Sequence, residues 1–190
     1  MERELMLTGI GGQGVQLAAQ IIARAAVLED RHALFFGIYG GMVRGGNTES
    51  TVVVGDAPIS SPPIVSRTWS AVVLHHQYWK PLSRKLRPEG VLVLNSSLFE
   101  GSVDRDSYRV FEVPATEMEA ELGSPMAASM VMVGAYAGVT GLVGIDALVR
   151  AMSDSVPSYR QQHVAGNERA LRAGFERLPQ AAAPAWEETP

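Results

Sequence analysis

The chain of 190 residues contains no cysteine, and this absence excludes several kinds of chemistry. Without cysteine there can be no disulfide, no thiol nucleophile and no iron–sulfur cluster held by cysteine ligands. The sequence also lacks an apolar run of the roughly 18 residues that a membrane-spanning helix needs. Its first residues, Met1-Glu-Arg-Glu4, are not typical of a signal peptide. We therefore expect a cytoplasmic protein that does not enter a membrane.

Charged residues are scarce as well. Asp, Glu, Lys and Arg make up 19% of the sequence against 46% for the hydrophobic residues, and the formal net charge is −4. A negative chain gives no reason to expect nucleic-acid binding. The length suits one domain with a sizeable core. A surface with few charges also suggests that part of it is covered by a partner.

The most informative stretch is a glycine-rich turn near the start of the chain. Gly9, Gly11 and Gly14 have the spacing G-x-G-x-x-G between an apolar run (5–7), typical of a buried strand, and a strongly helix-forming stretch (15–28). Glycine allows a tight turn, and a helix N-terminus offers free N–H groups and a partial positive charge. The pattern therefore predicts a place for a phosphate or another anion. A strand-to-helix turn packed against a partner would give the same spacing.

A dinucleotide site would need one more feature. An acidic residue about 20 positions further on, at the end of the second strand, holds a ribose hydroxyl in such sites. The second strand is expected at 33–38 and runs into Tyr39-Gly-Gly-Met42, whereas Glu29 and Asp30 precede it. This disfavours bound NAD or FAD, and with it a self-sufficient NAD-dependent reductase.

Strands and helices alternate along the rest of the chain. The patterns predict strands at 48–54, 70–75, 90–95 and 108–113, and helices at 77–86, 116–122, 126–138, 145–152 and 158–178. This alternation predicts an α/β fold: a single domain with a mostly parallel, Rossmann-like sheet and helices on both faces. The domain is expected to span residues 1–178. Residues 179–190 form a low-complexity tail that should be mobile unless Trp186 docks on the domain.

Two of the expected helices have unusual compositions. The helix at 126–138 is apolar nearly all round, which predicts burial on several sides, and its methionines are expected to fill core or interface. In the last helix, Ala170 and Gly174 would permit another backbone to approach closely. We expect this helix to pack on the chain's own sheet rather than to form a separate ligand site.

No set of residues predicts a complete active site. His75 and His76 end a strand, where adjacent side chains point to opposite faces, so hydrogen-bonded structural histidines are favoured over a shared metal. Glu117, Glu119 and Glu121 are spaced two apart on a helix, which spreads them around it and favours a solvated face. No serine lies in a G-x-S-x-G turn. We expect no catalytic and no metal-ligating residue in this chain.

Arg44 is the remaining candidate. It precedes Gly45 and Gly46 in a glycine-framed loop that follows the second strand. A fixed fork of N–H donors on such a loop suits a carboxylate or a phosphate. A surface arginine on a turn is the alternative, and the sequence leaves both open.

Three stretches taken together resemble one family, the γ subunits of 2-oxoacid:ferredoxin oxidoreductases. They are Gly9-Ile-Gly-Gly-Gln-Gly-Val15, Tyr39-Gly-Gly-Met-Val-Arg-Gly-Gly46 and Asn167-Glu-Arg-Ala-Leu-Arg-Ala-Gly174. The family includes the pyruvate, 2-oxoglutarate, 2-oxoisovalerate and indolepyruvate enzymes. The resemblance covers nearly everything from Leu5 to Leu178, and it implies a pyruvate/ketoisovalerate oxidoreductase γ-type domain.

The resemblance implies an enzyme of several chains or domains. Together they would convert a 2-oxoacid, coenzyme A and oxidised ferredoxin to acyl-CoA, CO2 and reduced ferredoxin. Thiamine diphosphate with Mg²⁺ and [4Fe-4S] clusters would lie in partner subunits, in agreement with the absence of cysteine here. This chain would be a scaffold and part of a coenzyme A site at the subunit interface. The cofactor-binding residues that the resemblance implies are Gly9, Gly11, Gly12, Gln13, Gly14, Arg44, Gly45 and Gly46. The alternative is a stand-alone phosphate- or nucleotide-binding module without a catalytic partner.

Overall fold

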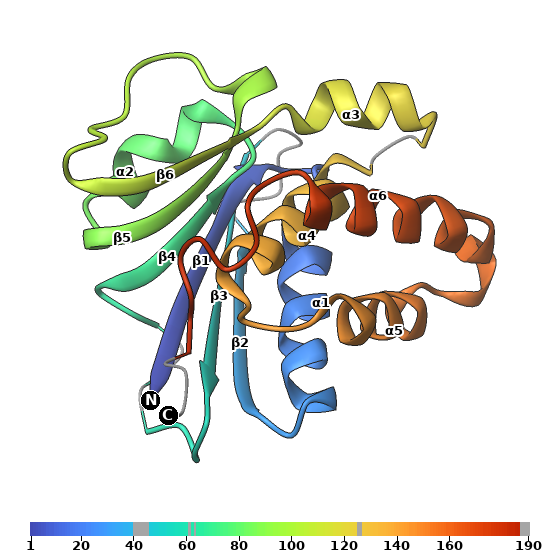
Figure 1. The fold of residues 1–190 in the computed structure, drawn as a ribbon, viewed down its shortest axis with the longest axis horizontal. Helices are drawn as coiled ribbons and strands as arrows, with labels where there is room; N and C mark the ends of the chain where they lie inside the picture. Colours follow the sequence, from blue (N-terminus) through green and yellow to red (C-terminus); the bar gives the residue numbers. More distant parts are fainter. Residues whose placement is uncertain (40–45, 61, 63, 125–126, 187–190) are drawn as a thin grey trace.

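The computed structural model describes residues 1–39, 46–60, 62, 64–124 and 127–186. Its centre is a six-stranded sheet with the strand order β2-β3-β1-β4-β5-β6 (Figure 1). The strands are β1 Glu2–Ile10, β2 His32–Tyr39, β3 Asn47–Gly55, β4 Thr68–Val73, β5 Leu86–Asn95 and β6 Tyr108–Val113.

The sheet is mostly parallel, with one exception. β1, β4, β5 and β6 pair in parallel, whereas β3 is antiparallel to both of its neighbours, β1 and β2. β1 and β2 therefore run in the same direction with β3 inserted between them. The predicted single-domain α/β fold with a mostly parallel sheet is confirmed. In this sheet β2 does not lie directly beside β1, because β3 is paired between them.

The helices are distributed unequally over the two faces of the sheet. The α-helices are α1 Val15–Leu28, α2 Trp79–Ser83, α3 Ala115–Leu122, α4 Ala128–Thr140, α5 Ile145–Ser155 and α6 Val164–Glu176, and the 3-10 helices are η1 His76–Tyr78, η2 Ser96–Leu98 and η3 Ser158–His163. The helices α1, α4, α5 and α6 gather on one side of the sheet, while the short α2 lies on the other (Figure 1). Helices thus occur on both faces, as expected, but the long ones share one face.

Two predicted helices are shorter in the structure. The stretch 77–86 contains only part of η1 and the five residues of α2. The helix stops early because β5 begins at Leu86, and the Lys85 carbonyl before it already accepts a hydrogen bond from the Thr68 amide of β4. The last helix, expected over 158–178, starts with the 3-10 turn η3 and becomes α-helical only at Val164.

Helix α4 forms the centre of the larger core. Every residue from Ser129 to Thr140 is buried, which confirms the predicted burial on several sides. The Tyr136 hydroxyl lies 2.9 Å from the Ser70 Oγ of β4, so the helix is also tied to the sheet by a buried hydrogen bond.

The last helix packs on α4 rather than on the sheet, which corrects the expectation. The backbones approach so closely that a Cβ at Gly174 would lie 2.0 Å from the Val131 carbonyl oxygen, and one at Gly134 would lie 2.0 Å from the Leu171 oxygen. Glycine on both helices makes this crossing possible. The pair is an internal contact of the domain.

The chain beyond Leu178 remains packed on the domain as far as Trp186. The amides of Ala183 and Ala185 donate to the carbonyls of Val139 and Thr140 at the end of α4. The Trp186 Nε1 donates to the Leu142 carbonyl at 3.1 Å, and the Arg31 guanidinium lies 3.8 Å over its ring. Of the two possibilities for this tail, the structure therefore shows the docked one for the part that it describes.

Candidate functional site

The glycine turn connects the end of β1 to the start of α1. Gly12 and Gly14 have φ angles of 106° and 79°, which L side chains rarely adopt, so glycine is required at both. The Gln13 amide donates to the Ile10 carbonyl at 3.0 Å, and the Gln13 Oε1 accepts from the Ile10 amide at 2.7 Å. The side chain of Gln13 thus closes the turn from within.

The remaining predicted residues take different places around this turn. A Cβ at Gly9 would lie 2.7 Å from the Gln13 Oε1, so Gly9 makes room for the residue that closes the turn. The Gly11 amide donates to the Gly46 carbonyl at 2.9 Å, which brings the start of β3 to the turn. The structure therefore gathers the predicted residues that it describes. Arg44 and Gly45 lie outside the described residues.

The turn is open to solvent and favourable to an anion. Gly11 and Gly12 are exposed, and a Cβ at Gly12 would meet no atom within 4 Å. Helix α1 has Gly14 as its N-cap, no side-chain cap and no acidic residue in its first turn. The first N–H groups of a helix have no acceptor within it, and they carry its partial positive charge. Among the residues that the structure describes, the turn thus presents backbone groups and a helix start to solvent, without an acidic or basic side chain of its own.

Ser129 of α4 lies beside the glycine turn, a contact that the sequence did not predict. Ser129 is the second residue of α4, and its Oγ lies only 2.8 Å from the position that a Cβ on Gly14 would take. A signal was present, because Ser129 is a hydroxyl within a run of apolar residues, but nothing in the sequence shows that the starts of α1 and α4 meet.

The paired histidines are structural. Their rings stack with centroids 4.6 Å apart, so the expectation that they point to opposite faces is wrong, because β4 already ends at Val73. The His75 Nδ1 accepts from the Gln77 amide, and the His76 Nδ1 lies 3.0 Å from the Leu98 carbonyl. These bonds confirm the hydrogen-bonded reading. Burial, with a smaller contribution from His76, lowers the pKa of His75.

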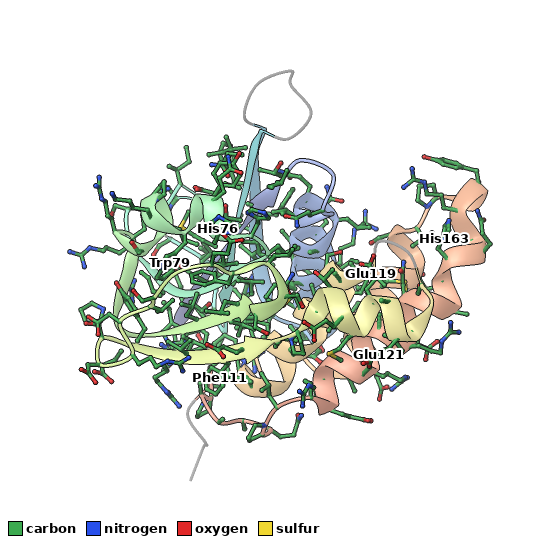
Figure 2. All side chains as sticks on the ribbon, turned by 90° about the horizontal axis from the view of Figure 1, so that it is seen from above. His76, Trp79, Phe111, Glu119, Glu121 and His163 are labelled. Carbon is green, nitrogen blue, oxygen red and sulfur yellow. The ribbon has the colours of Figure 1, made fainter. Side chains whose placement is uncertain are left out.

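The acidic residues of α3 do not form one solvated face. Glu117 and Glu121 are exposed as expected, but the Glu119 Oε2 accepts from the Ala128 amide at 2.7 Å. Glu119 therefore caps the first turn of α4. Figure 2 shows the labelled Glu119, His76 and His163 on separate elements. Among the described residues no three His, Asp or Glu side chains gather as a metal site would require.

No helix in the part of the chain that the structure describes is long and apolar enough to cross a membrane. The fold and the turn instead define a Rossmann-like α/β domain with an anion-favouring strand-to-helix turn. Such a class contains many unrelated functions, so sequence comparison is needed to distinguish them.

Residues 4–177 match the family model described as pyruvate ferredoxin/flavodoxin oxidoreductase. The chain is 31% identical to the 2-oxoglutarate synthase subunit KorC of Methanocaldococcus jannaschii, over 93% of this chain and 94% of that one. It is 32% identical to the pyruvate synthase subunit PorC of Methanothermobacter thermautotrophicus, over 92% and 95% of the two chains. The chain therefore belongs to the pyruvate ferredoxin/flavodoxin oxidoreductase family, which confirms the resemblance.

Solved structures agree. The γ subunit of a keto/oxoacid ferredoxin oxidoreductase from Geobacter sulfurreducens superposes with a TM-score of 0.77 at 26% identity, covering 92% of this chain and 97% of that one. The 2-oxoglutarate:ferredoxin oxidoreductase from Magnetococcus marinus gives a TM-score of 0.83 at 16% identity, over 96% of this chain but 32% of that one. The second likeness concerns the fold alone, and it shows this fold as one part of a longer chain. The matches to separate oxidoreductase subunits favour an enzyme subunit over a stand-alone module.

Proposed function

We propose that this chain is the γ subunit of a multi-subunit 2-oxoacid:ferredoxin oxidoreductase, which forms acyl-CoA, CO2 and reduced ferredoxin from a 2-oxoacid, coenzyme A and oxidised ferredoxin. The observation that carries the proposal is the end-to-end similarity to KorC and PorC, which are subunits of a 2-oxoglutarate synthase and a pyruvate synthase. The chain acts in it as a scaffold. Its partners are the thiamine-diphosphate-binding and ferredoxin-type chains of the same enzyme, in the cytoplasm.

We assign thiamine diphosphate, Mg²⁺ and the [4Fe-4S] clusters to those partner chains. The sequence has no cysteine to hold a cluster. Within the described ranges no three carboxylates or imidazoles gather around a common point. Under this proposal, the groups that carry electrons and activate the 2-oxoacid lie in the partner chains.

The turn from Gly11 to Gly14 is the element of this chain that we propose to face coenzyme A. Its exposed glycines and the uncapped start of α1 suit a phosphate group. Arg44, predicted on the loop that ends at Gly46, would contribute a charge-assisted contact to the same phosphates. When bound, coenzyme A supplies the thiol that accepts the acyl group. The Magnetococcus marinus enzyme, whose structure has coenzyme A and succinyl-CoA bound, shares this fold and supports the proposal.

Native purification of the tagged chain, followed by mass spectrometry and cofactor analysis, tests the assembly. We expect thiamine-diphosphate-binding and ferredoxin-type chains to co-elute in fixed stoichiometry, with iron and thiamine diphosphate in the same fraction. The chain prepared alone should contain neither. Elution of the native chain as a monomer without these partners would contradict the proposal.

A further inference from the structure

Strand β2 is an open edge of the sheet. It pairs with β3 along its whole length, from His32 to Tyr39, without a bulge, and no strand among the described residues pairs with its other side. The strand contains no Asp, Glu, Lys, Arg or Pro. Soluble proteins usually protect a long edge strand with such residues or with a bulge, because its unpaired N–H and C=O groups can pair with another chain. β2 has none of these protections.

The opposite edge of the sheet, β6, differs in this respect. Arg109 and Glu112 are exposed on it. Arg109 donates to the Ala182 carbonyl of the C-terminal segment, and Glu112 forms an ion pair with Arg105. Charged side chains therefore protect β6, and within the described part of the chain β2 is the edge that suits another strand.

Apolar side chains flank the β2 edge on both faces of the sheet. Leu34, Phe36 and Ile38 alternate along the face away from α1, and Leu34 and Ile38 are exposed there. On the other face, a groove of about 340 Å³ lies between α1 and β2. It is lined mainly by the apolar side chains of Ala23, Val27, Leu28, Ala33 and Phe35. A strand added to β2 would therefore bury apolar surface on both of its faces.

We infer that the strand added to β2 is β2 of a second copy of this chain, in antiparallel pairing about a two-fold axis at Phe36. In this register Leu34 pairs with the partner's Ile38, and Phe36 pairs with the partner's Phe36. No other register pairs all three side chains of this face with one another. A two-fold axis perpendicular to the sheet keeps each face on its own side, so the partner's Phe35 lies opposite Gly37, beside the groove.

The lack of charge on β2 favours a second copy as the occupant. A two-fold axis places a strand opposite its own sequence, so a charged residue at the centre would face its own copy and repel it. β2 has no such residue. A strand that carries charges would instead place them against apolar side chains without a counter-charge, which costs free energy.

The size of the edge sets the expected strength of the dimer. A strand of 8 residues is about 26 Å long, and with side chains on both faces the edge is roughly 20 Å deep. Each copy then covers roughly 500 Å², so the total of roughly 1,000 Å² lies at the lower end for specific interfaces. The dimer should therefore dissociate on dilution, and a covalent trap at high concentration is the suitable measurement.

Disulfide trapping of the full chain tests this pairing, because the sequence has no cysteine and an introduced one is the only thiol. The variants are oxidised at high concentration and separated by non-reducing electrophoresis. Phe36→Cys should form a disulfide dimer, because the Cα atoms of directly opposite residues are about 4.5–5.5 Å apart. Leu34→Cys alone and Ile38→Cys alone should not, because each lies about 13 Å from its own copy. An equal mixture of these two variants should give the mixed dimer.

Tyr159→Cys, at an exposed site in η3, is the control for random collision and should give no dimer. The mixture of Leu34→Cys and Ile38→Cys keeps the test valid if Phe36→Cys does not fold. Two outcomes would overturn the inference: no mixed dimer, or dimers of either single variant in the same yield as the mixed one. The pairing does not depend on the enzyme proposed above, because the trap uses this chain alone.

Discussion

Gly174 is the residue on which the contact between α6 and α4 most directly depends. A methyl group there would lie 2.0 Å from the Val131 carbonyl oxygen, and a backbone atom cannot move aside as a flexible side chain can. Gly174→Ala should therefore destabilise the protein by about 3 kcal/mol, measured by urea unfolding. Arg169→Ala, at an exposed site on the same helix, should change stability by less than about 0.5 kcal/mol. Equal stabilities of the two variants would contradict the close crossing.

Tyr136 links α4 to the sheet, and its burial predicts a dependence on pH. Burial raises the pKa of its hydroxyl well above the ordinary value near 10. A raised pKa in the folded state means that the contribution to stability is complete below the unfolded pKa and is lost as the pH rises above it.

Tyr136→Phe tests this dependence. At pH 7 the variant should lose about 1 kcal/mol, because the hydrogen bond to Ser70 is gone. Between about pH 10 and 12 its stability should fall less steeply than that of the wild type, since no buried hydroxyl has to ionise. Parallel pH curves of the two proteins would contradict the assignment.

The sequence predicted the positions of some residues around the turn and not of others. The spacing of Gly9, Gly11 and Gly14 predicted the turn because each glycine requirement is local, set by φ angles and close approach within a few residues. The position of Ser129 beside Gly14 could not be predicted, because it depends on two helices far apart in sequence meeting at their starts. Glu119 was misjudged for the same reason, since its acceptor role depends on where α4 begins.

At the scale of elements, Trp186 anchors the C-terminal segment. Its ring stacks under Arg31 and its Nε1 bonds the Leu142 carbonyl. Trp186→Ala should cost about 2 kcal/mol, whereas Trp186→Phe, which keeps the ring and loses the hydrogen bond, should cost about 1 kcal/mol. Thermal unfolding of the two variants and the wild type measures this order. Wild-type stability in Trp186→Ala would show that the segment contributes nothing to the fold.

Elements with a long, periodic pattern were predicted well. Helix α1 has the predicted bounds, Val15–Leu28, and β6 has the predicted bounds, Tyr108–Val113. The direction of β3 was not predictable, because a β-branched run looks the same in parallel and antiparallel pairing. The prediction of a helix over 77–86 was wrong at both ends, because η1 occupies its start and β5 already begins at Leu86, which leaves five residues for α2.

For the whole molecule, the large apolar side chains that are exposed among the described residues lie outside helix α4. The apolar helix α4 is buried and cannot cause self-association. Four of them lie on two neighbouring elements: Val27 (57% exposed) and Leu28 (40%) on α1, and Leu34 (37%) and Ile38 (45%) on β2.

Leu34 and Ile38 each lie two positions from Phe36 and so share one face of the edge strand β2, opposite the face on which Ala33 and Phe35 pack with the core. The isolated chain should therefore self-associate through this exposed face of β2. The double variant Leu34→Glu/Ile38→Glu should be more monomeric than the wild type in analytical ultracentrifugation. Tyr159→Glu, at an exposed aromatic residue in η3, should leave the association unchanged. A monomeric wild type at high concentration would contradict this prediction.

The most direct test of the proposed role is the rate of 2-oxoacid-dependent ferredoxin reduction by the purified partner chains, measured against coenzyme A concentration with and without this chain. We expect coenzyme A-dependent, saturable turnover only when the chain is present, because it completes the assembly and contributes to the coenzyme A site. Equal rates and the same coenzyme A dependence in its absence would contradict the account.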